Sequence, residues 1–62
     1  MIKKYYNIEL DTNDAAIFRA MLHAEDFTFE SSGAGDMVHF EVFIVWPSDL
    51  SFLNEWIAEN LF

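Results

Sequence analysis

The chain has 62 residues, 53% of them hydrophobic, and its eleven acidic and three basic residues give a formal net charge of −8. A chain of this length forms one domain at most, so we expect a single small domain over residues 1–62. The hydrophobic content excludes a disordered acidic segment. The charge disfavours direct binding of nucleic acid, whose phosphates it would repel.

The absence of cysteine excludes disulfides and a thiolate zinc site, which is typical of a protein of a reducing cytoplasm. No apolar run approaches the roughly 18 residues of a membrane span. The opening residues, MIKKYYN, lack the apolar core of a signal peptide. We therefore expect a cytoplasmic protein without a membrane partner.

The first predicted strand covers residues 2–10, where apolar and polar residues alternate and two lysines near the start suit a sheet edge. The capping residues 11–14 then predict the start of a helix that ends near His23 or Ala24. Glu25 and Asp26 would oppose its dipole if the helix continued. Arg19 and His23 are expected on its solvated face. The residues expected to face the core are Ile17, Phe18, Ala20, Met21 and Ala24.

Two further strands and a helix follow. Residues 27–31 alternate, with Phe27 and Phe29 inward, and residues 32–36 supply a flexible reversal. Residues 37–46, MVHFEVFIVW, predict the central strand. Pro47 ends it, and a second helix is expected to begin with Ser48 as N-cap and Asp49 in its first turn and to run to about Asn60. The predicted dry face of the strand is Val38, Phe40, Val42 and Ile44, and the core stripe of the helix is Leu50, Leu53, Ile57 and Leu61.

This β-α-β-β-α order predicts an α+β fold. A crossover through the first helix followed by a hairpin lets the third strand insert between the other two, antiparallel to both. The expected architecture is a two-layer sandwich: a three-stranded antiparallel sheet in the order 1-3-2, with both helices on one face and the other face open.

No chemistry-bearing motif points to an enzyme. His39 and Glu41 lie two apart on the expected open face, where Glu9 or Glu30 could complete a metal site, but an ordinary cross-strand charge pair explains the same residues. No nucleophile stands in a known motif with a histidine and an acid. We expect no catalytic residues, no metal and no cofactor.

The second helix carries aromatic residues that its core stripe does not require. Phe52 and Trp56 are four residues apart beside the stripe, bordered by Glu55 and Glu59. Aromatic anchors rimmed by charge are typical of protein-binding surfaces. Packing of both rings as peripheral core is an equal alternative. Further candidate partner-binding residues are Phe62 and, on the open sheet face, Tyr5, Phe43 and Glu41.

These features predict a small acidic module for protein–protein interaction, an inhibitor or regulator that binds a basic site on a partner such as a nucleic-acid-handling protein. In size, acidity and lack of cysteine the chain is similar to the small inhibitors that phages and mobile elements produce against host enzymes, a likeness that defines no family. Mimicry of nucleic acid is a narrower version, with Glu55 and Glu59 as one phosphate-like pair. The alternative is a homodimeric structural or assembly protein.

Overall fold

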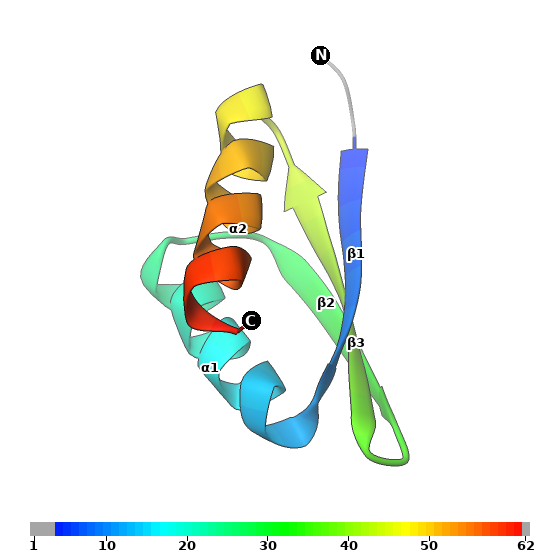
Figure 1. Cartoon of the computed structure of the whole chain (residues 1–62). Coiled ribbons are helices and arrows are strands. Elements are labelled where there is room, and N and C mark those ends of the chain that lie inside the picture. The colour runs from blue at the N-terminus through cyan, green and yellow to red at the C-terminus, as the bar shows by residue number, and fades with distance from the viewer. Residues whose placement is uncertain (1–3, 62) are drawn as a thin grey trace.

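The computed structural model describes residues 4–61 (Figure 1). The predicted order of elements is confirmed, but the predicted positions of Ile2 and Lys3 lie outside the described residues. The elements are β1 (Lys4–Asp11), α1 (Thr12–Ala24), β2 (Phe29–Ala34), β3 (Met37–Ile44) and α2 (Pro47–Asn60).

The sheet has the predicted topology, with three strands in the order β1-β3-β2 and β3 antiparallel to both neighbours. Phe40 and Val42 are fully buried, Ile44 is nearly so and Val38 is half-buried, which confirms the predicted inward face of β3. The strand ends at Ile44, two residues before the predicted end, because the chain turns away into α2 and leaves the next two residues exposed.

The β2–β3 turn is shorter than predicted. Ala34 pairs with Met37, so only Gly35 and Asp36 form the loop. Gly35 has a φ of +63°, which glycine adopts without steric cost and which two-residue hairpin loops require.

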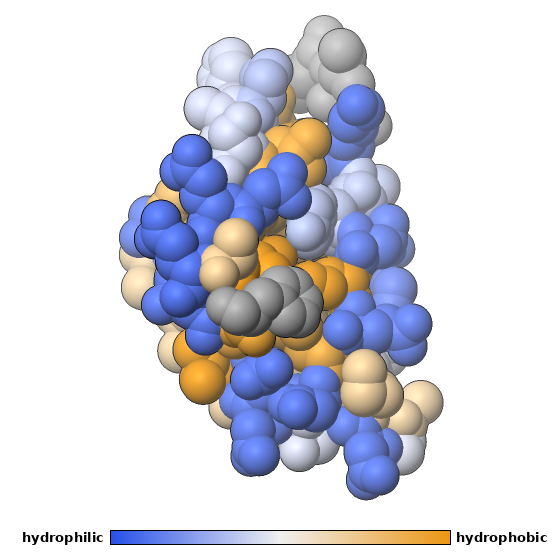
Figure 2. Space-filling model, viewed as in Figure 1, coloured by the Kyte–Doolittle hydropathy of each residue, from blue (hydrophilic) through white to orange (hydrophobic). Residues whose placement is uncertain are grey.

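Both helices cover one face of the sheet and leave the other open, which gives the predicted two layers (Figure 1). The core between the layers is built around Phe18 of α1 and Phe40 of β3, whose rings meet edge to face at a centroid distance of 5.0 Å. Figure 2 shows hydrophobic side chains reaching the surface along the seam between α2 and β1, with hydrophilic ones on both sides. Across this seam the Tyr6 hydroxyl donates to Asn54 Oδ1 at 3.3 Å. Neither α1 nor α2, the helices of the described range, is long and apolar enough to cross a membrane.

The predicted inward face of α1 is partly wrong. Phe18 and Met21 are buried as expected, but Ala15 and Leu22 complete the core face, while Ala20 and Ala24 are exposed and Ile17 is 50% exposed. The helix is rotated relative to the prediction because apolar residues occupy more of its circumference than one face needs.

Arg19 does not belong to the solvated face that was predicted for it. Its guanidinium carbon lies 5.5 Å from the centroid of the Phe40 ring, and its Nη2 donates to Ser31 Oγ at 3.2 Å. The guanidinium therefore lies over the Phe40 ring in cation–π geometry and also bonds to the exposed Ser31. His23 is exposed as expected, with its ring edge-on to Phe29 at 5.3 Å.

The end of α1 explains why β2 begins later than predicted. The amide of Asp26 donates to the carbonyl of His23, and the amide of Phe27 donates to the carbonyl of Leu22. These two bonds define a Schellman motif with Asp26 at its left-handed position, where φ is +62°. The amide of Phe27 is therefore used in the helix cap and is not free to pair in the sheet. Its side chain packs on the core, and β2 begins at Phe29.

The start of α2 also differs from the prediction. Trp46, and not Ser48, is the N-cap residue, and Pro47 occupies the first helical position. Asp49 Oδ2 accepts from the backbone amide of Trp46 at 3.3 Å, which fixes the entry of the chain into the helix. The predicted core stripe is otherwise correct, since Leu53 and Ile57 are buried and Leu50 and Leu61 pack beside them.

Candidate protein-binding groove

The two aromatic residues predicted as anchors on α2 have different surroundings. Trp56 is half-buried, with its ring 5.8 Å from that of Phe18, so it has the position of peripheral core. Phe52 is 36% exposed. Glu55 and Glu59 are exposed on the same helix. The structure therefore separates Phe52, which is available at the surface, from Trp56, which joins α2 to α1.

The predicted residues Tyr5, Phe43 and Glu41 lie on the open sheet face. The rings of Tyr5 and Phe43 meet edge to face at 5.6 Å, and their residues are paired between β1 and β3. Glu41 is directly opposite Glu30 in the next strand, a like-charge pair that opposes sheet formation. Phe62 lies outside the described residues. A homodimer formed through this face stays a prediction.

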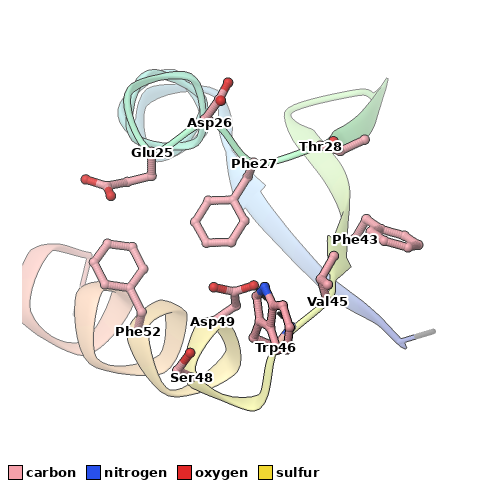
Figure 3. A pocket seen from close by; sticks show the side chains of 10 residues that line it. All are labelled: Glu25, Asp26, Phe27, Thr28, Phe43, Val45, Trp46, Ser48, Asp49 and Phe52. Carbon is pink, nitrogen blue, oxygen red and sulfur yellow. Dashed lines mark hydrogen bonds between the residues drawn. The ribbon is translucent and has the colours of Figure 1, made fainter. Parts of the chain in front are cut away.

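A groove of about 470 Å³ is lined by Phe52 and Phe43 and by residues that were not predicted as a site. The Phe43 ring points away from Phe52 at the edge of the groove (Figure 3). One wall comes from the end of α1 and the segment before β2, and the other comes from the end of β3 and the first turns of α2. The lining residues are Glu25, Asp26, Phe27, Thr28, Phe43, Val45, Trp46, Ser48, Asp49 and Phe52.

Four of the residues that line the groove are aromatic: Phe27, Phe43, Trp46 and Phe52. The rings of Phe27 and Phe52 stack across it, with centroids 6.1 Å apart and planes 25° apart. Trp46 is 66% exposed, and Val45 beside it is also exposed. Val45, Trp46 and Phe52 thus place exposed apolar side chains together outside the core, which is a feature of binding surfaces.

The charged residues that line the groove are all acidic: Glu25, Asp26 and Asp49. Glu25 is the C-cap of α1 and Asp26 the residue after it, so both carboxylates add to the partial negative charge of the helix end. Acids at this end of a helix destabilise it, and a left-handed backbone at a residue other than glycine adds to the cost. The stability of α1 therefore does not account for these two residues.

The residues weighed as a metal site do not assemble one. His39 Nε2 lies 3.2 Å from Asn7 Oδ1 on the open sheet face, and a hollow of about 280 Å³ beside it is lined by Glu30 and Glu41 among others. Within residues 4–61, no group of three metal-ligating side chains is placed to hold an ion.

The sequence did carry signals for the groove. Trp46 directly precedes Pro47, which begins a helix. Because proline is excluded from a central strand, the strand must end before this point. Glu25 and Asp26 are unfavourable at the end of a helix, and such acids predict a role outside the helix as well as its end. The groove was missed because its two walls are about twenty residues apart in the sequence.

Comparisons of this chain with protein-family models, curated proteins and solved structures find no match.

Proposed function

We propose that this chain is a protein-binding module that acts by occupying a basic site on another protein. The observation that supports the proposal is the groove between the end of α1 and the start of α2, which combines exposed aromatic residues with three carboxylates and no basic lining residue. Aromatic anchors supply affinity in protein interfaces, and opposite charge directs the encounter.

The charge of the groove favours a basic partner over a second copy of the same chain. A second copy carries the same net charge of −8 and would bring its own carboxylates to any symmetric contact through the groove. Like charges brought together at an interface cost several kcal/mol. A segment with lysine or arginine beside apolar side chains instead matches both the charge and the apolar surface.

The groove has room for side chains of such a segment. Its volume of about 470 Å³ is far above the roughly 10–15 Å³ that a cavity needs to hold one water molecule. Phe27 and Phe52 form an apolar base, and the carboxylates border it (Figure 3). Binding and exclusion of other ligands from the partner's basic site constitute the activity, and no chemical step is required. By occupying the basic site of its partner, the chain would act as an inhibitor or regulator of that partner.

Nuclear magnetic resonance of the labelled protein tests the proposal with two capped peptides of equal length. One alternates leucine and lysine, and the other alternates leucine and glutamate. We expect the lysine peptide to shift the amides of residues 25–28, 45, 46, 48 and 49 in a saturable way, and the glutamate peptide to leave them unchanged. Failure of the lysine peptide to shift them, or shifts confined to the open sheet face, would overturn the proposal.

A pair of double variants separates the groove carboxylates from net charge. Glu25→Gln with Asp26→Asn removes two groove charges, while Glu9→Gln with Asp36→Asn removes two exposed charges elsewhere. Both variants have the same net charge. We expect the groove variant to lose about ten-fold in affinity for the lysine peptide and the control about two-fold or less. Equal losses would assign the binding to the overall charge of the molecule.

A further inference from the structure

We propose that the groove selects arginine over lysine, with the guanidinium of an arginine in the partner stacked on the Trp46 indole and paired with the Asp49 carboxylate. This inference rests on the proposed function and specifies the partner at the same site. It is carried by the exposure of Trp46, by the fixed backbone that presents it and by the carboxylate beside it.

The position of Trp46 has no explanation in the stability of the fold. It is the N-cap residue of α2, where serine, threonine, aspartate or asparagine would add a side-chain hydrogen bond that tryptophan does not supply. Its side chain is 66% exposed, so the ring contributes little to the core. A large aromatic residue at an exposed cap is accounted for by contact with a ligand.

The backbone of Trp46 is held in one conformation before any ligand arrives. Its φ of −116° and ψ of 144° are the extended values that a following proline favours. Its amide donates to Asp49 Oδ2, and its carbonyl accepts from the amide of Asp49 at 3.0 Å. Such preorganisation reduces the entropy lost when a partner binds.

The chemistry of these two residues matches a guanidinium better than an ammonium. Arginine is planar, stacks on aromatic faces, is more weakly hydrated than lysine and donates two parallel hydrogen bonds to a carboxylate. Figure 3 shows the Trp46 ring and the Asp49 carboxylate as neighbours at one end of the groove. Glu25 and Asp26 stand on the opposite wall, where they add negative potential around the same cation.

Calorimetry with three capped peptides tests the preference. The peptides share one leucine-rich frame and carry lysine, arginine or citrulline, the last of which is planar like arginine but uncharged. We expect the arginine peptide to bind about 3- to 10-fold more tightly than the lysine peptide. The citrulline peptide should bind at least about ten-fold more weakly than the arginine peptide.

Variants at Trp46 show whether the indole causes the preference. Trp46→Leu keeps an apolar side chain and should bring arginine affinity down to that of lysine, whereas Trp46→Phe keeps an aromatic face and should retain most of the preference. Asp49→Asn keeps the capping oxygen but loses the charge, and should weaken arginine binding about five-fold. Asp36→Asn, in the hairpin turn, should leave it unchanged. Thermal melts of each variant establish that it is folded.

The outcomes separate the inference from the proposed function. Binding of the lysine and arginine peptides at the groove with equal affinity would overturn the arginine preference and leave the basic-segment module standing. A preference that survives in Trp46→Leu would also overturn the assignment to the indole. Failure of both cationic peptides to bind would overturn the proposed function and this inference together.

Discussion

The rings of Phe27 and Phe52 stack at a centroid distance of 6.1 Å and so connect the capping turn of α1 to the second turn of α2. Phe27 enters this contact because its amide caps α1, and Phe52 because the helix begins at Pro47. The base of the groove therefore depends on how two helices end and begin, not on the sheet.

The core depends on Phe40, which is fully buried between Phe18 and Phe29. Phe40→Ala should cost about 3–5 kcal/mol through lost burial and a residual cavity. A domain of this size has only about 3–5 kcal/mol from its core, so the variant should be largely unfolded at 25 °C. Circular dichroism in a urea titration measures this. A cooperative urea transition with a midpoint close to that of the parent protein would contradict the central position of Phe40.

The two tryptophans should respond differently to truncation. Trp56 is half-buried against Phe18, so Trp56→Ala should destabilise the fold by about 2 kcal/mol. Trp46→Ala should change stability by about 0.5 kcal/mol or less but weaken the arginine peptide complex. Melting temperature and affinity, measured for both variants, test this division. Reduced affinity without loss of stability in Trp56→Ala would instead return Trp56 to the role of an interface anchor.

The left-handed backbone of Asp26 should limit stability. Asp26→Gly relieves the steric cost of a φ of +62° and removes an acid from the end of α1, which should stabilise the fold by about 0.5–1 kcal/mol and raise Tm by about 2–8 °C. The matched control is Asp36→Gly. The φ of Asp36 is not positive, so glycine there relieves no strain and only increases the conformational entropy lost on folding. Calorimetric melts compare the two variants. An unchanged or lower Tm for Asp26→Gly would show that the carboxylate itself stabilises the turn.

Salt should slow association with a basic peptide. The Debye length falls from about 30 Å at 0.01 M to about 8 Å at 0.15 M ionic strength, which screens the attraction between the acidic groove and an approaching cation. Stopped-flow measurements with the arginine peptide should show an association rate that falls several-fold over this range, with a smaller change in the dissociation rate. A flat association rate would remove electrostatic steering and leave apolar docking as the source of affinity.

The sheet could be predicted from the sequence because its signals are local and agree with one another. The clean alternation of residues 38–44 identifies a strand with one buried face, and the short segment before it must form a hairpin. A hairpin after a crossover then leaves the middle position to the third strand, as observed.

The orientation of α1 could not be predicted, because Ile17 and Leu22 are both apolar and only the shape of the sheet decides between them. Leu22 is fully buried and Ile17 is half exposed. The position of Arg19 over Phe40 follows from the same rotation. Propensity and periodicity do not contain this information, which resides in tertiary packing.

The candidate site was predicted only in part. Phe52 and Phe43 were predicted as partner-binding residues, and both line the groove. The apolar-rich run of residues 37–46 predicts Trp46 as part of the central strand, where it would be paired. Its exposure follows from the early end of β3, which in turn follows from the use of Pro47 as the first residue of α2.

The central claim, that a cationic segment binds against Trp46, can be tested by the intrinsic fluorescence of two single-tryptophan variants. Trp56→Phe leaves Trp46 as the only tryptophan, and Trp46→Phe leaves Trp56. On titration with the arginine peptide, we expect a saturable change in the emission of Trp46 and almost none in that of Trp56, because of the two tryptophans only Trp46 lines the groove. No change at Trp46 on addition of saturating peptide, or a change at Trp56 alone, would contradict the claim.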